Sequence, residues 1–232
     1  MSGSTDKMML GGDPPVEVQL RRSARARRLS LRVSGLDGRV TLSMPRDLPE
    51  RQARAFLDDK ADWVRAHVGE SKDLRVPKIG DTVPVEGREL PVVIAAGRPA
   101  ISAVAVHVRK GRPVPAQVAA LLKLRARDRL TERCDAHAAQ LGRRFGRITL
   151  RDTRSRWGSC TSAGNLMFSW RLIMAPPEIL DYVAAHEVAH LVHMNHSAAF
   201  WDVVARLYPD YRAKRGWLRE NGASLHRVRF DA

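Results

Sequence analysis

Three histidines and one glutamate in the last quarter of the chain have the types and spacing needed for metal-assisted hydrolysis. His186 and His190 are four residues apart, and His196 follows six residues later. Side chains at positions i and i+4 share one face of a helix, so the first two imidazoles can bind one ion. Glu187 lies between them, placed to take a proton from a metal-bound water. A third ligand at His196 would leave a fourth position open, which is typical of a catalytic zinc site and not of a structural one.

The residues around this motif predict a buried helix followed by a sharp elbow. A Pro-Pro pair at 176–177 suits a first turn, where the missing N–H groups would have no partner anyway. The run 178–194 has no Gly or Pro and is apolar on nearly all sides, which indicates burial. Buried imidazoles and carboxylates need partners, and a metal supplies one to all of them. Asn195 suits a left-handed turn and Ser197 a helix start, so we expect His196 at the elbow, facing the metal.

His193 is the main alternative ligand, because it lies three residues after His190. A straight helix would place it about 10.5 Å from His186 along the axis, too far to share one ion easily. A pair formed by His190 and His193 would also leave Glu187 unexplained. We therefore expect one zinc ion per chain, bound by His186, His190 and His196. His193 is kept as a supporting group or proton donor, with a surface or packing role equally open.

Length and composition limit the class of protein. The chain has 232 residues, of which 44% are hydrophobic, so it can bury a proper core in one domain or two. No apolar run reaches the roughly eighteen residues that predict a membrane span. The polar start has no hydrophobic signal region, and two cysteines are too few for a disulfide framework. We therefore expect a cytoplasmic protein with no membrane partner, while the oligomeric state stays open.

The formal net charge of +15 favours anionic partners, nucleic acid among them. An arginine-rich composition would also produce this charge without any selection for binding. Two clusters stand out, one in or beside an early strand and one leading into the segment before the metal-binding helix. The first contains Arg21, Arg22, Arg25, Arg27, Arg28 and Arg32, and the second contains Arg143, Arg144, Arg147, Arg151, Arg154 and Arg156.

Hydrophobic periodicity divides the chain into a β-rich first part and a helix-dominated second part. Alternating residues predict early strands, including a hairpin with Asp37-Gly38 at its turn. We expect an α+β fold in which a helical catalytic domain with a small antiparallel sheet follows a β-rich region. The expected strands are 16–20, 29–33, 40–44, 148–154 and 165–172, and the expected helices are 49–68 and 115–145. The expected divisions are a disordered lead-in at 1–15, a β-rich region with one helix at 16–112, and the catalytic domain at 113–232.

Further motifs extend the histidine pattern beyond the helix expected to carry His186 and His190. It comprises Arg154-Ser155-Arg156-Trp157-Gly158-Ser159-Cys160, Trp170-Arg171-Leu172, Ala175-Pro176, Asp181-Tyr182-Val183, His186-Glu187, His190-Leu191, Asn195-His196 and Phe200-Trp201. The set resembles the YgjP-like metallopeptidase domain, a family of zincin-type hydrolases similar in pattern to the SprT-like and WLM metalloproteases. A looser likeness extends over most of the chain. The resemblance implies zinc bound by His186, His190 and His196, with Glu187 as the general base.

The leading functional hypothesis is a zinc-dependent metallopeptidase in which Glu187 activates water and passes the proton to the leaving group. A peptide would bind as an added strand beside the strand that ends near Ser169. Candidates for stabilising the transition state or binding substrate are His193, Arg154, Arg156, Trp157, Tyr208 and Tyr211.

Two further hypotheses fit the positive charge. One is a hydrolase of nucleotide phosphoanhydrides that releases pyrophosphate, since guanidinium groups bind phosphate well. The other is a DNA-associated protease or a basic nucleic-acid-binding module. A purely structural zinc would have no use for Glu187, which weighs against the binding module.

Overall fold

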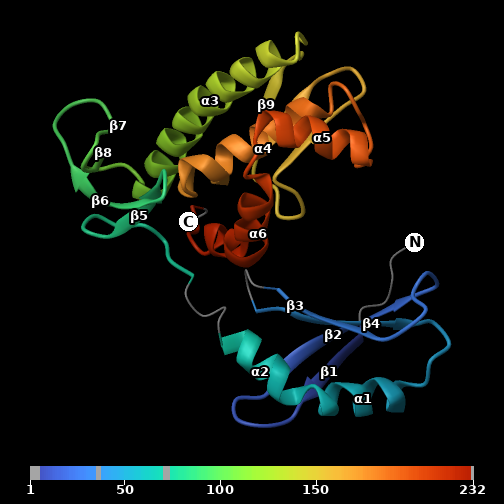
Figure 1. Ribbon diagram of the computed structural model, residues 1–232. Coiled ribbons are helices and arrows are strands. Elements are labelled where there is room, and N and C mark those ends of the chain that lie inside the picture. Colours follow the sequence, from blue (N-terminus) through green and yellow to red (C-terminus); the bar gives the residue numbers. More distant parts are fainter. Residues whose placement is uncertain (1–5, 35–37, 70–73, 231–232) are drawn as a thin grey trace. The chain divides into compact units, whose positions relative to one another are not determined.

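The computed structural model describes residues 6–34, 38–69 and 74–230. The chain forms two compact units, residues 1–74 and residues 75–232 (Figure 1). The expected boundary near residue 112 differs from this division. Strands between residues 82 and 108 bury their apolar side chains in the core of the second unit, beside the long helix that follows them.

The first unit is a four-stranded sheet with two helices packed on it. Its strands are β1 (Asp6–Leu10), β2 (Val16–Ser23), β3 (Ser30–Val33) and β4 (Val40–Pro45), in the order β1-β2-β4-β3. The expected hairpin is confirmed, because β3 and β4 pair antiparallel; Asp37 of its turn lies outside the described residues. Alternate side chains of β2 and β4, such as Val18 and Leu42, point into the core.

Two details of this unit correct the expectations. Residues 6–10, placed in a disordered lead-in, form strand β1, which pairs antiparallel with β2 and buries Met8 and Leu10. The single helix expected over 49–68 is two helices, α1 (Glu50–Asp59) and α2 (Ala61–Gly69). The break is at Lys60, whose N–H is shared between the carbonyls of Phe56 and Leu57 in a tightened last turn.

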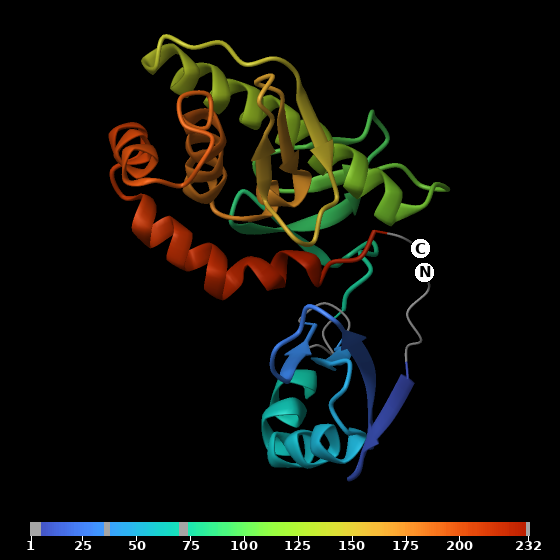
Figure 2. The ribbon, with the colours of Figure 1, turned by 90° about the vertical axis from the view of Figure 1, so that its right-hand side faces the viewer.

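The second unit begins with the sheet β5 (Thr82–Val85), β6 (Arg88–Ile94), β7 (Ala100–Ile101) and β8 (Val106–Val108), in the order β5-β6-β8-β7. The long helix α3 (Val114–Gln140) follows. One side of α3 is buried along its length, including Val118, Leu122, Leu130 and Cys134. The helix therefore provides the surface against which β8, the later strand at 148–151, and the elements at 170–174 and 177–189 pack (Figure 2).

A three-stranded sheet lies beside α3 and precedes the helix that contains His186. Its strands are β9 (Ile148–Arg151), β10 (Gly158–Cys160) and β11 (Leu166–Ser169), in the order β10-β11-β9. β10 and β11 pair antiparallel, but β11 and β9 pair parallel, so the sheet is mixed and not antiparallel as expected. The strand expected over 165–172 ends at Ser169 and continues as the 3-10 helix η2 (Trp170–Met174).

The remaining elements are α4 (Pro177–Ala189), α5 (Ala198–Leu207), α6 (Tyr211–Asn221) and the 3-10 helix η3 (Gly222–His226). α4 is the most buried of them and packs against α3, α5, α6 and β10. Its surroundings make it the central element of an α+β unit. Among the described residues, no helix is both long and apolar enough to cross a membrane.

Candidate metal centre

Helix α4 carries the first histidine of the motif in its last turn, and the second directly follows the helix. It begins at Pro177 with Pro176 before it, as expected from the Pro-Pro pair. It ends at Ala189 and not near Met194, and His190 is the residue that follows it. The N–H groups of Leu191 and Val192 bond to carbonyls three residues back, which marks the tightened end of the helix.

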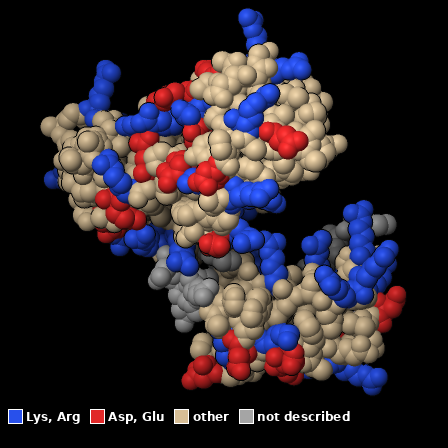
Figure 3. All heavy atoms as spheres, in the orientation of Figure 1, with Lys and Arg blue, Asp and Glu red and all other residues tan. Residues whose placement is uncertain are grey.

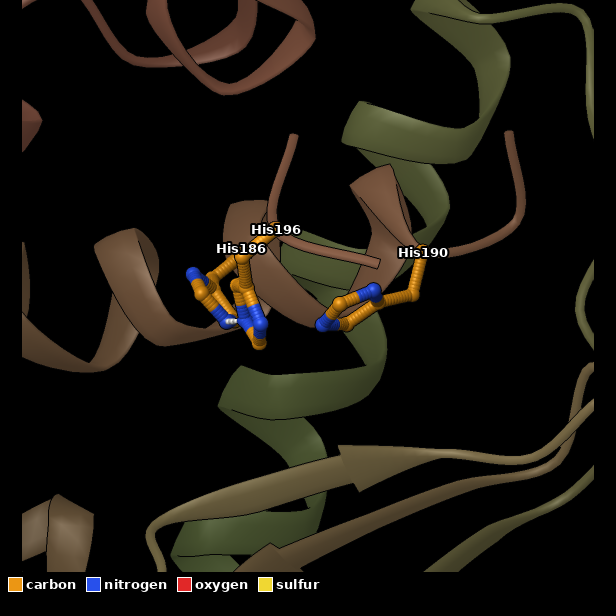
Figure 4. A group of neighbouring side chains, drawn as sticks. All are labelled: His186, His190 and His196. Atoms are coloured by element: carbon orange, nitrogen blue, oxygen red, sulfur yellow. Dashed lines mark hydrogen bonds between the residues drawn. The ribbon is translucent and has the colours of Figure 1, made fainter. Parts of the chain in front are cut away.

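The chain then reverses and brings His196 back over the helix. Ser197 precedes α5, and its hydroxyl accepts a hydrogen bond from the N–H of Phe200. This is the cap expected at that position. His196 therefore lies in the elbow between α4 and α5, where its ring faces those of His186 and His190 (Figure 4).

The three imidazoles converge closely enough to share one ion. Their ring centroids are 4.8 to 5.1 Å apart, and one nitrogen from each ring lies within 4.8 Å of the other two. The Nε2 atoms of His186 and His196 are 3.1 Å apart. Two nitrogens bound to zinc at about 2.0–2.1 Å with tetrahedral angles would be about 3.3 Å apart. The separation therefore fits a pair of ligands to one small cation.

The protonation of the rings also fits metal binding. Nδ1 of His190 donates a hydrogen bond to the carbonyl of His193 at 2.9 Å, which leaves Nε2 of His190 with its lone pair free. Burial, with the neighbouring His190 and His196, lowers the pKa of His186 to about 3. Burial also lowers the pKa of His190. Neutral imidazole is the form that binds a metal, and this donor set suits zinc and other first-row divalent ions.

Phe200 forms an apolar floor beneath all three rings. It is fully buried, and its ring centroid lies 5.0 Å from that of His186, 4.4 Å from that of His190 and 4.8 Å from that of His196. Trp201 adds ring contacts at 5.6 Å to His186 and 5.8 Å to His196. Because α5 supplies both aromatic residues, its packing against α4 fixes the orientation of the imidazoles.

Glu187 points from α4 toward the neighbouring strand β10. A Cβ atom added to Gly158 would lie 2.5 Å from Oε1 of Glu187 and 2.6 Å from its Cγ. The strand backbone therefore has room for the carboxylate only because residue 158 has no side chain. Burial raises the pKa of Glu187 to about 8, and Arg156 opposes this rise. Within the part of the chain that is described, the carboxylate has no hydrogen bond or ion pair.

A cavity of about 330 Å³ opens beside His186 and Glu187. Strand β10 and the residue before it supply one wall, α4 a second and α6 a third. The remaining lining residues are Trp157, Gly158, Tyr182, Val183, Arg215, Leu218 and Arg219. The open side of the carboxylate thus faces a space that a substrate group can enter.

The structure distributes the other expected site residues unevenly. Trp157 lines the cavity and its ring lies 5.3 Å from that of His226. His193 contacts the centre through its carbonyl oxygen and not through its ring. Tyr211 is buried and stacks on Trp201 at 5.2 Å. Tyr208 lines a different cavity, one of about 420 Å³ that also contains Asp181.

The two arginine candidates lie outside the cavity lining. Arg154 and Arg156 are both exposed and precede β10. The charge of Arg156 tends to lower the pKa of Glu187, whereas the charge of Arg154 tends to lower the pKa of His226. Sequence reasoning quoted Gly158 and Tyr182 only as parts of the motif set, without a role in the site, and it did not single out Arg215 or Arg219. The i, i+4 spacing of the two arginines on α6 was a signal of a shared face, but nothing in the sequence indicates what that face meets.

The strand that was expected from the sequence to pair with a substrate peptide is not an edge strand. β11, which ends at Ser169, is the central strand of its sheet and is paired on both sides. The strand next to Glu187 is β10, which pairs with β11 alone among the described residues. An added peptide strand would therefore meet β10, because only an edge strand offers free N–H and C=O groups.

Two ionic networks, each with one largely buried member, hold the elements around the centre. Asp181 on α4 accepts two hydrogen bonds from Arg133 and one from His137, each 2.7 Å long. Burial would raise the pKa of Asp181, but these hydrogen bonds together lower it. They fasten α4 to α3, five residues before the first histidine.

The second network is centred on Arg171 of η2, which is only 7% exposed. Its guanidinium donates to both carboxylate oxygens of Asp152 and to the carbonyls of Leu225 and Val228. It therefore holds the segment before β10 and the segment after α6, which together carry the two rings of the Trp157–His226 contact.

Comparison with known proteins places this centre in a family. A search of curated proteins gave no match. The solved structure of the metallopeptidase zymogen of Pyrococcus abyssi abylysin aligns with 40% of this chain and 92% of its own, with 22% identity and a TM-score of 0.36. The family model of the YgjP-like metallopeptidase domain matches residues 27–221. Since that match covers most of the chain, the protein belongs to the YgjP-like metallopeptidase family.

Proposed function

We propose that the protein is a zinc-dependent peptidase in which His186, His190 and His196 bind one zinc ion and Glu187 is the general base. The observation that carries the proposal is the convergence of three imidazoles beside a buried carboxylate at the mouth of a cavity. A bound zinc ion would act as a Lewis acid toward the scissile carbonyl and lower the pKa of water.

Glu187 has the position and surroundings of a base. Its carboxylate accepts the proton of the attacking water and then delivers it to the leaving amine. A neighbouring dication favours the ionised form of the carboxyl, which counteracts the effect of burial on its pKa. The absence of any ion pair to Glu187 among the described residues keeps its oxygens available for this proton.

The peptide is proposed to bind along the free edge of β10. This strand ends at Cys160 and begins at Gly158, the residue that contacts Glu187. A substrate strand paired with it would run past the carboxylate, and its side chains would alternate toward and away from the cavity.

Substitution of the proposed base tests the function directly. The purified chain would be assayed for bound metal, for cleavage of casein and for phosphate or pyrophosphate release from nucleotides. Glu187→Gln should retain the metal and lose peptide cleavage, whereas Glu178→Gln, in the first turn of the same helix, should keep both. Wild-type turnover by Glu187→Gln would refute the base. Phosphate release that depends on Glu187 would instead favour the nucleotide hydrolase, although neither Arg154 nor Arg156 lines the cavity.

A second proposed property is nucleic-acid binding by the first unit. The segment 21–46 contains eight arginines, all exposed, and its described residues include no acidic side chain. Figure 3 shows basic side chains gathered over the strands of this unit. DNA binding that weakens steeply as salt rises would support this partner, and salt-independent or absent binding would refute it. Together with the peptidase centre, such binding would describe a protease that acts near DNA in the cytoplasm.

A further inference from the structure

Helix α6 presents two arginines to the cavity that contains the proposed base. Arg215 and Arg219 are four residues apart and therefore share one face of the helix, with Leu218 beside them. All three line the cavity of about 330 Å³ together with His186 and Glu187. The wall of the cavity that α6 supplies is thus cationic, and α6 contributes none of the three histidines.

Neither cation is neutralised by a strong ion pair. The guanidinium of Arg215 lies over the ring of Trp201, 4.8 Å from its centroid, and no carboxylate among the described residues pairs with it. Arg219 approaches only its neighbour Glu220, at 3.6 Å, with both side chains more than two-thirds exposed. Such an exposed pair contributes little. The Trp201 contact holds Arg215 in place while leaving the N–H groups at the edge of its guanidinium free to donate.

The charge of the cavity is also one-sided. Among the described residues that line it, Glu187 is the only acidic one, and the proposed mechanism uses that carboxylate for proton transfer. A cationic substrate side chain would therefore meet two like charges, whereas a carboxylate would meet a planar guanidinium that can bind both of its oxygens.

We propose that Arg215, assisted by Arg219, forms a carboxylate-recognition subsite, so that the preferred peptides carry a carboxylate close to the bond that is cleaved. The carboxylate belongs either to an acidic side chain or to the C-terminus of the peptide. This inference rests on the proposed function, because it assigns a specificity to the same centre. Arg215 is a specificity-determining residue here and takes no part in the proton transfer.

Matched peptides distinguish the two sources of the carboxylate. One pair differs by Glu or Gln next to the cleaved bond, and a second pair has a free or an amidated C-terminus. The wild-type protein should cleave the carboxylate member of at least one pair with a kcat/KM about tenfold higher, mostly through KM. Arg215→Gln should abolish this preference while it still cleaves the uncharged peptide. Arg215→Glu should favour a Lys peptide over the Glu peptide.

Arg206→Gln is the matched control, because it removes one exposed arginine from α5, outside the cavity. It should retain the preference, which separates a local subsite from general attraction by the net charge. Equal cleavage of both members of each pair by the wild-type protein, or an unchanged preference in Arg215→Gln, would overturn the inference.

A binding measurement separates failure of the subsite from failure of the proposed function. Fluorescence anisotropy of labelled Glu and Gln peptides with Glu187→Gln protein needs no turnover. The Glu187→Gln protein should bind the Glu peptide more tightly than the Gln peptide, and the double variant that also carries Arg215→Gln should not. This result supports the subsite even if the wild-type protein cleaves no peptide. Equal binding of the two peptides refutes the subsite even if the wild-type protein is an active peptidase.

Discussion

Substitution of Gly158 by alanine should displace the carboxylate of Glu187 while metal binding stays unchanged. Gly158 is not one of the glycines with positive φ, so alanine is compatible with the backbone of β10. The added Cβ would lie 2.5 Å from Oε1 and 2.7 Å from Cδ of Glu187, whereas carbon contacts are normally about 3.5–4.0 Å. The carboxylate must therefore move by about 1 Å. A misplacement of that size in a reacting group costs about a hundredfold in rate.

Gly158→Ala should accordingly reduce kcat for peptide cleavage by about a hundredfold while the zinc content stays near that of the wild-type protein. Stability should fall by about 1–3 kcal/mol, because the buried side chain of Glu187 has to move from its Cγ outward while the backbone can stay in place. Mass spectrometry of bound metal, thermal unfolding and peptide kinetics measure the three quantities. Gly97→Ala is the control, since Gly97 is exposed and a Cβ there meets no atom within 4 Å. Undiminished kcat in Gly158→Ala would show that the carboxylate position is unimportant.

Four further outcomes are expected. His196→Ala should lose bound metal, whereas His193→Ala should keep it, because residue 193 acts through its carbonyl; the reverse result in metal analysis would reassign the third ligand. Removal of metal by a chelator should lower the melting temperature by about 5–10 °C, and an unchanged value would contradict a metal held by the folded state. Arg171→Met should destabilise the protein by about 1–3 kcal/mol in denaturant unfolding, since the buried carbonyls of Leu225 and Val228 lose their donor. Asp181→Asn should cost about 1–3 kcal/mol at neutral pH. The pKa of Asp181 is lowered in the folded protein, so its ionised carboxylate stabilises the fold above about pH 4. The cost of Asp181→Asn should therefore fade as the pH falls below about 4, and a cost independent of pH would contradict the ionic link.

The segment that brings the three histidines together could be predicted from local sequence. Helix periodicity, the Pro-Pro start and the cap at Ser197 act over a few residues, and together they place His196 in the elbow after α4. The end of α4 was less predictable, because the apolar run continues past Ala189. That early end has a chemical effect: it turns the carbonyl of His193 back toward His190.

Contacts between distant segments could not be predicted in the same way. Gly158 contacts Glu187 across 29 positions of the sequence, and Arg215 reaches the same cavity from a helix that follows both. A glycine within a short strand and an arginine on an amphipathic helix have many ordinary explanations. Their importance depends on which faces meet, and only the packing of α4 against β10 and α6 decides that.

The tyrosines illustrate the same limit. Tyr208 and Tyr211 were both candidates for stabilising the transition state or binding substrate. The turn between α5 and α6 instead directs Tyr211 into a stack on Trp201 and Tyr208 toward Asp181. Tyr182, four residues before His186, lines the cavity because it lies one helical turn away on the same face of α4.

The beginning and the end of the described second unit are joined by backbone pairing. The N–H of Arg75 bonds to the carbonyl of Arg227 at 2.9 Å, and the N–H of Arg229 bonds to the carbonyl of Arg75 at 2.7 Å. Neighbouring ends of this kind allow a domain to be circularly permuted or inserted into a loop of a host protein. The second unit is therefore suited to circular permutation or insertion into another protein. New termini for a permuted chain are best placed in an exposed loop such as the one that contains Gly97.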